Sequence, residues 1–131
     1  MPFEVCQELS KGGSSNFAVA EFEQATWLKK QPSALDLSPW LLNTLDLGEA
    51  SVIQLALDLG LKTVCIDEAI GRRVARLSGL SLTGSMGILL KAKRHNPNFL
   101  LKDAIARMLA KKIRLSKTVI DFALEQAGEA I

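Results

Sequence analysis

The acidic residues of this sequence are the ones whose type and spacing could support a chemical reaction. Asp67 and Glu68 come directly after a β-favouring run at residues 63–66. Ligands of open parallel sheets gather at the carboxyl ends of the strands, so this acid pair occupies a favourable place for a site. The alternative is structural, because an aspartate at this position would also cap a following helix.

Two further acidic segments have helical patterns. Glu4 and Glu8 are four residues apart, so a helix would project both carboxylates from one side. Glu49 lies at the start of an apolar helical run, where the helix dipole favours an acid. Glu8 and Glu49 therefore each have two interpretations, an ordinary helical glutamate or a ligand that faces a common site.

Basic side chains follow the acid pair along the chain in two groups. The groups are Arg72, Arg73 and Arg76 on one predicted helix, and Lys91, Lys93 and Arg94 near the end of the next. Contact with the phosphates of a nucleic acid is one interpretation, and cations that complement a helix C-terminus are the other. The chain has no Tyr, five Phe and two Trp, so few rings are present to stack bases.

Length and composition predict a single domain, residues 1–131, with a real core. Residues 1–68 hold ten acids and four lysines or arginines, whereas residues 69–131 hold four acids and twelve lysines or arginines. Cys6 and Cys65 lie far apart within apolar segments. We therefore predict that both are buried free thiols in a reducing compartment. A single histidine, His95, gives a zinc site little support. No leader or bilayer-spanning run is recognisable, so we predict a cytoplasmic protein without membrane contact.

Apolar periodicity predicts mostly helices with a few short strands. Helices are expected over residues 2–11, about 14–26, 48–59, 69–78, 85–95 and about 100–112. Residues 14–16 would cap the second of these. Two further helices are expected to begin after capping serines, one after Ser38 and before Pro39, and one after Ser116 that ends at about residue 127. Strands are expected at residues 62–67 and 80–83, with a further short strand at 27–31. Gly60 and Gly128 would end two of the helices.

The alternation of helix and strand predicts an α/β fold with a short parallel sheet flanked by helices. The strand at residues 62–67 lacks alternation, which predicts cover on both of its faces. The C-terminal third is predicted to be helical.

Several short motifs follow one another along most of the chain. They are Val5-Cys6-Gln7-Glu8-Leu9, Leu45-Asp46-Leu47-Gly48-Glu49-Ala50, Cys65-Ile66-Asp67-Glu68, Gly71-Arg72-Arg73-Val74-Ala75, Leu82-Thr83-Gly84-Ser85-Met86-Gly87, Leu90-Lys91-Ala92-Lys93 and Arg114-Leu115-Ser116. In this order they resemble a PIN-like family of uncharacterised prokaryotic proteins, related to the toxin ribonucleases of toxin–antitoxin pairs. The resemblance implies a three-layer α/β/α fold.

The resemblance also implies an activity. PIN domains are expected to bind Mg²⁺ or Mn²⁺ through three or four acids and to hydrolyse single-stranded RNA. Hard divalent cations take oxygen ligands, and they activate water in phosphodiester cleavage. By this resemblance Glu8, Glu49 and Asp67 would be catalytic, and the metal ligands would be Glu8, Glu49 and either Asp67 or Glu68. Single-stranded RNA and an antitoxin-like protein are the implied partners.

The chain departs from the family pattern at its start. PIN domains open with a strand that ends in a metal-binding aspartate, whereas Met1-Pro2-Phe3 already resembles the loop after the second strand. Loss of a central strand would leave unpaired edges and exposed apolar surface. We therefore predict an N-terminally truncated PIN-like ribonuclease, impaired or inactive, that forms a homo-oligomer or pairs with another chain. The alternatives are a non-catalytic RNA- or protein-binding module and a structural oligomeric remnant.

Overall fold

The computed structural model describes residues 1–11 and 19–129. These residues group into two compact units, Met1–Leu82 and Thr83–Ile131. The single domain expected from the length of the chain stays a prediction.

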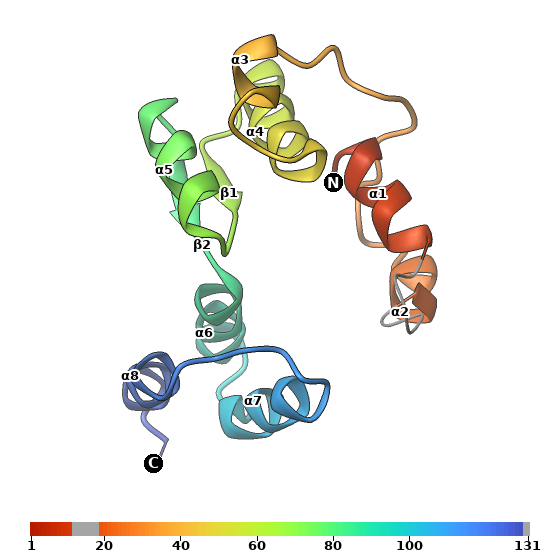
Figure 1. Cartoon of the computed structure of the whole chain (residues 1–131). Helices are drawn as coiled ribbons and strands as arrows, with labels where there is room; N and C mark the ends of the chain where they lie inside the picture. The colour runs from red at the N-terminus through yellow and green to blue at the C-terminus, as the bar shows by residue number, and fades with distance from the viewer. Residues whose placement is uncertain (12–18, 130–131) are drawn as a thin grey trace. The chain divides into compact units, whose positions relative to one another are not determined.

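In the described residues, helix and strand alternate in the middle of the chain, with further helices before and after (Figure 1). They are α1 (Phe3–Ser10), α2 (Val19–Gln24), α3 (Pro39–Leu42), α4 (Leu47–Leu59), β1 (Thr63–Cys65), α5 (Ala69–Leu77), β2 (Ser81–Thr83), α6 (Ser85–His95), α7 (Leu101–Ala110) and α8 (Lys117–Ala127). The two strands pair in a parallel sheet and α5 connects them. The predicted α/β fold with a short parallel sheet is therefore confirmed, as is the helical C-terminal third.

Local sequence signals fix the ends of two long helices. The Asp46 Oδ1 atom accepts a hydrogen bond from the backbone N–H of Glu49 at 2.8 Å, which caps the start of α4. The Ser116 hydroxyl oxygen accepts from the N–H of Val119 at 3.2 Å, so the predicted cap of α8 is confirmed. Gly60 ends α4 with φ of 68° and Gly128 ends α8 with φ of 72°, a conformation that glycine adopts without strain.

The core of the N-terminal unit forms around α4, which packs against α1, α3, α5 and β1. Leu41, Ile53 and Ala75 of α5 are fully buried there, and Val64 of β1 is also buried. A helix with apolar residues on most of its circumference can bury them only when neighbours surround it. The position of α4 therefore follows from its composition, and it carries the start of this helix into contact with acids from other elements.

The C-terminal unit is a packed set of three helices, α6, α7 and α8, around Leu101, Ile105 and Leu124. The carboxylate of Glu129 accepts hydrogen bonds from the N–H groups of Leu101 at 2.7 Å and Lys102 at 3.0 Å. Helix starts leave such donors without partners inside the helix, so this carboxylate satisfies the start of α7.

The structure contradicts the short strand expected at residues 27–31. These residues form turns and irregular backbone, and Trp27 is 81% exposed. The N–H of Gln31 donates to the carbonyl of Met1 at 2.9 Å, and the amino group of Met1 donates to the carbonyl of Lys29 at 2.7 Å. The segment therefore follows the start of the chain without joining a sheet. The caps expected at residues 14–16 lie outside the described residues.

Three further expectations about burial and capping were wrong. Strand β1 is covered on one face only, because Val64 is buried while Thr63 and Cys65 are exposed. Both cysteines are free, but Cys6 is partly buried and Cys65 is exposed, so neither is a buried thiol. The hydroxyl of Ser38 donates to the side-chain oxygen of Gln54 at 2.8 Å instead of capping α3. Among the described residues, no helix has both the length and the apolar character needed to cross a bilayer.

Candidate functional site

Glu49, in the first turn of α4, is the centre of an acidic cluster that also contains Asp46 and Glu68. Burial raises the pKa of Glu49 from 4.5 to about 7, and the charges of Asp46 and Glu68 and hydrogen bonds to both carboxyls contribute to the rise. Like charges at close range cannot all ionise at low cost. A proton on Glu49, or a nearby cation, would relieve this repulsion.

Glu68 reaches this cluster from the position just before α5, and its side chain does not cap that helix. Asp67 is not among the groups that shift the pKa of Glu49. Partial burial raises the pKa of the Cys65 thiol, the Asp67 carboxylate raises it further, and Arg72 lowers it, which places Asp67 beside these two residues. Sequence reasoning left the choice between the two acids open, and the structure places Glu68 beside Glu49. The catalytic role of Asp67 stays a prediction.

Glu8 and Glu49 each lie against a glycine in the first turn of another helix. A β-carbon added to Gly48 in α4 would lie 2.7 Å from Oε1 of Glu8. A β-carbon added to Gly71 in α5 would lie 2.5 Å from Oε2 of Glu49. The structure therefore brings acids from α1 and α4 to helix starts, although Glu8 is not among the groups that shift the pKa of Glu49.

The acidic cluster fits a divalent cation only in part. In the part of the chain that the structure describes, no three acids, histidines or cysteines converge to hold a metal ion. The carboxyls of Asp46 and Glu68 nevertheless lie close enough to Glu49 to raise its pKa. Mg²⁺ commonly takes one or two carboxylates and completes its shell with water and substrate phosphate. The oxygen donors of Glu49 and Glu68 suit such a site.

Two acids near α1 and α4 were not identified from the sequence as parts of the site or core. Asp46 stands three residues before Glu49, and this spacing is a known helix-start signature that could have identified it. Glu4 is only 5% exposed, and its Oε2 atom accepts from the N–H of Leu35 at 2.9 Å. Its other oxygen has no hydrogen-bond partner among the described residues. Nothing local to α1 predicts this burial, because the covering segment is about thirty residues away in sequence.

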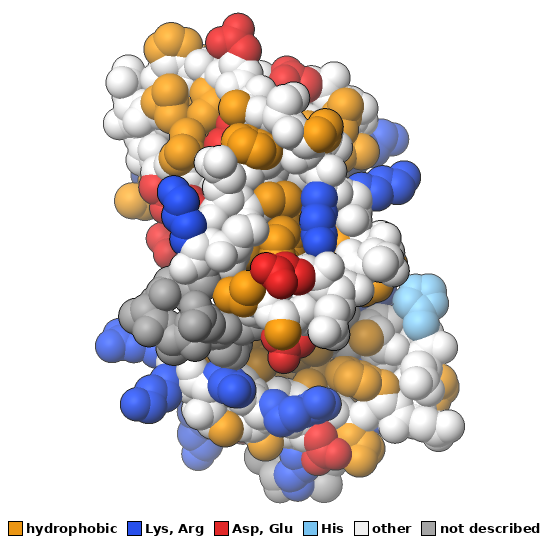
Figure 2. All heavy atoms as spheres, turned by 90° about the vertical axis from the view of Figure 1, so that its right-hand side faces the viewer, with side chains coloured by type: hydrophobic (Ala, Val, Ile, Leu, Met, Phe, Trp, Pro, Cys, Tyr) orange, Lys and Arg blue, Asp and Glu red, His pale blue; other side chains and the backbone are white. Residues whose placement is uncertain are grey.

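Two of the six basic residues predicted to contact nucleic acid are engaged within the protein. Arg72 donates to the carbonyl of Ile66 at 2.7 Å. Lys93 donates to the carbonyl of Phe99 at 2.7 Å and forms an ion pair with Glu129 at 3.4 Å. The other four, Arg73, Arg76, Lys91 and Arg94, are exposed. Figure 2 shows lysine and arginine side chains, in blue, on the surface of the protein.

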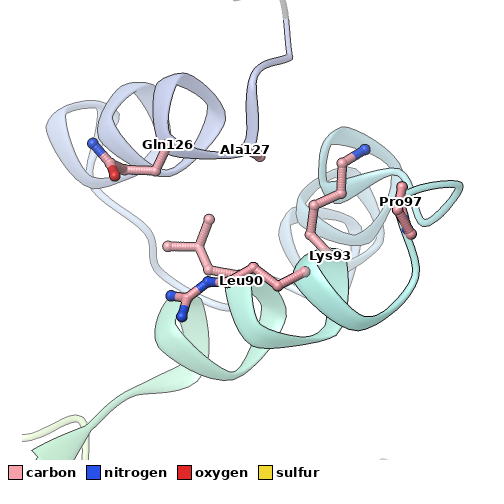
Figure 3. Close-up of a pocket in the computed structure, with 6 residues that line it drawn as sticks. Leu90, Lys93, Pro97, Gln126 and Ala127 are labelled. Carbon is pink, nitrogen blue, oxygen red and sulfur yellow. The ribbon is translucent and has the colours of Figure 1, made fainter.

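A hollow of about 320 Å³ lies between α6 and α8 of the C-terminal unit (Figure 3). It is lined by the apolar side chains of Leu90, Pro97 and Ala127 and by the polar side chains of Lys93, Arg94 and Gln126. Of the two basic residues that line the hollow, Lys93 is paired with Glu129, and Arg94 is exposed.

The fold and the cluster together define an α/β protein with an acidic site at the starts of its helices. A family model described as a PIN domain matches residues 1–129, and the chain therefore belongs to the PIN domain family. No curated protein and no solved structure matches the chain. The predicted PIN-like membership is confirmed, and it gives the chain a nuclease-like fold. The toxin–antitoxin relationship stays a prediction.

Proposed function

We propose that this chain is a divalent-metal-dependent ribonuclease that hydrolyses single-stranded RNA. The observation that supports this proposal most directly is the contact of Glu49 with Asp46 and Glu68. Perturbed carboxyls gathered outside the core are typical of functional sites, because a fold gains no stability from such repulsion. Membership of the PIN domain family supports a nuclease in particular.

Each acid of the cluster has a definite part in the proposed reaction. Glu49 and Glu68 would hold Mg²⁺ or Mn²⁺, which when bound activates water and stabilises the leaving oxygen of the phosphodiester. Asp46 caps α4 at the N–H of Glu49 and so fixes the helical turn from which Glu49 projects. Arg73 and Arg76, exposed on α5, provide positive charge for the RNA phosphates.

Nuclease assays with Mn²⁺ on the wild type and on Glu49→Gln, Glu68→Gln and Asp67→Asn test the proposal. We expect losses of about 100-fold or more for the first two variants, because each removes a charged ligand. Glu23→Gln is the matched control, since Glu23 is an exposed acid of α2 outside the cluster. Asp67→Asn decides whether that acid takes part. Equal residual activity in all variants would show that the cleavage comes from elsewhere and would refute the proposal.

A second candidate function is RNA binding without cleavage. The charge of the C-terminal unit favours it, because residues 83–131 hold nine lysines or arginines and four acids. Salt-sensitive RNA binding that persists in Glu49→Gln, with no cleavage by the wild type in Mn²⁺ or Mg²⁺, would favour this function. Lys91→Ala combined with Arg94→Ala should then weaken binding and reduce its salt dependence.

A further inference from the structure

The glycines that Glu8 and Glu49 contact, Gly48 and Gly71, lie at helix starts that do not themselves require glycine. Gly48 and Gly71 both lie in the first turns of helices, and inside a helix glycine is less favourable than alanine by about 1 kcal/mol. The glycines with positive φ among the described residues are Gly60, Gly79 and Gly128. Left-handed backbone therefore does not explain Gly48 or Gly71, and close approach of another group does.

The group that approaches is a carboxylate in both cases. At Gly48 the nearest atoms to an added β-carbon are all from Glu8, with Oε1 at 2.7 Å, Oε2 at 3.1 Å and Cδ at 3.2 Å. At Gly71 they are Oε2 of Glu49 at 2.5 Å, Cγ2 of Ile66 at 2.9 Å and Cδ of Glu49 at 3.3 Å. The same arrangement thus occurs twice, with an acid of α1 on the start of α4 and an acid of α4 on the start of α5.

We propose that Gly48 and Gly71 are positioning residues of the acidic site. Each leaves bare the backbone of a helix start, so that a carboxylate from another helix can lie where the helix dipole favours negative charge. Gly71 leaves room for the carboxylate of Glu49 at the start of α5, close to Glu68, the residue just before that helix. Gly48 holds the carboxylate of Glu8 at the turn that carries Glu49. This role rests on the proposed metal-dependent function.

The two alanine variants differ in what they disturb. The three atoms nearest to a β-carbon at position 48 belong to the end of the flexible Glu8 side chain, so in Gly48→Ala we expect Glu8 to move away and the fold to stay intact. Gly71→Ala also meets the side chain of Ile66, which is 5% exposed, so part of its effect falls on the core. Gly48→Ala is therefore the cleaner test. Gly71→Ala needs a double-mutant cycle that separates its effect on Glu49 from its effect on Ile66.

Double-mutant cycles on the full chain make this separation, with Mn²⁺ affinity from calorimetry and unfolding in urea as readouts. The cycles pair Gly48→Ala with Glu8→Ala, and Gly71→Ala with Glu49→Ala. We expect each glycine variant to weaken Mn²⁺ binding by about tenfold, as loss of a supporting contact does. Gly48→Ala should not weaken Mn²⁺ binding further when Glu8 is already alanine. Gly71→Ala should not weaken it further when Glu49 is already alanine. The control combines Gly71→Ala with Glu8→Ala, because the atoms nearest to a β-carbon at position 71 belong to Glu49 and Ile66. Their separate effects on Mn²⁺ affinity should multiply.

The readouts separate the failure of this role from the failure of the proposed function. A wild type that binds Mn²⁺, with glycine variants that bind equally well or act independently of their own acids, overturns the positioning role alone. A wild type that binds no Mn²⁺ overturns the metal-dependent function and this role together. Preserved unfolding behaviour in Gly48→Ala, with weakened Mn²⁺ binding, is the result that a merely structural glycine would not give.

Discussion

Replacement of Glu49 by glutamine should stabilise the folded chain while it removes the proposed activity. The amide keeps the size of the carboxyl and donates hydrogen bonds to the carboxylates of Asp46 and Glu68. It also removes the negative charge that these neighbours oppose. The predicted gain in stability needs neither metal nor RNA, so it tests the geometry of the cluster by itself.

The size and sign of the effect follow from the raised pKa of Glu49. The folded-state pKa is about 7 and the ordinary value is 4.5, so the folded chain binds more protons than the unfolded chain between these two pH values. The contribution of Glu49 to the stability of the wild type should therefore fall as pH rises from about 5 to about 8. The full difference of about 2.5 in pKa corresponds to roughly 3.4 kcal/mol. Glu49 is only partly buried, and solvent screening reduces this to about 1 kcal/mol.

Urea unfolding followed by far-ultraviolet circular dichroism at about pH 5 and about pH 8 measures the effect. Glu49→Gln should match the wild type at the lower pH and exceed it by about 1 kcal/mol at the higher pH, which corresponds to about 4 °C in Tm. Glu23→Gln, at an exposed position of α2, should show no such difference between the two pH values. A Glu49→Gln variant that gains no stability over the wild type between these two pH values, or that is less stable at about pH 8, would show that Glu49 does not lie beside Asp46 and Glu68.

Four further predictions concern packing, caps and association. Ile53→Ala should lower the free energy of unfolding by about 2–5 kcal/mol in urea, because a fully buried side chain leaves a cavity. Ser116→Ala should lower it by about 1 kcal/mol in thermal unfolding, through loss of the cap on Val119. Glu129→Ala should speed amide hydrogen exchange at the start of α7, and unchanged exchange there would contradict its hydrogen bonds. The predicted homo-oligomer should appear in sedimentation equilibrium, and a monomer at every concentration would refute it.

Most helices could be predicted from the sequence because their signals are local. The bounds of α6 were predicted at Ser85 and His95, and the Ser116 cap and the stops at Gly60 and Gly128 were also correct. The short strands were found within two residues because β-favouring runs stand between helices. The strand expected at residues 27–31 failed, because strand formation needs a partner that no local pattern reports.

The acids of the candidate site were predicted in part. Glu49 was recognised at the start of its helix, and Glu68 was one of two open choices after the strand. The contact of Glu49 with Asp46 and Glu68 depends on how α4 and α5 pack, and so does the position of Asp67 beside Cys65 and Arg72. Two consecutive residues after a strand point in different directions, so small changes of backbone course decide which one faces a site.

The sequence by itself determined where helices begin and end, which of them are apolar, and that the chain is an α/β protein of the PIN-like kind. Caps, glycine stops and periodicity act within one or two turns, so a linear reading of the chain detects them. Tertiary structure alone decided that Glu4 is buried, that Glu8 and Glu49 lie on glycines of other helices, and that Glu49 has a raised pKa. Apart from Asp46, which is a sequence neighbour of Glu49, the groups involved are brought together from distant parts of the chain, and burial and the approach of Glu68 have no local signature.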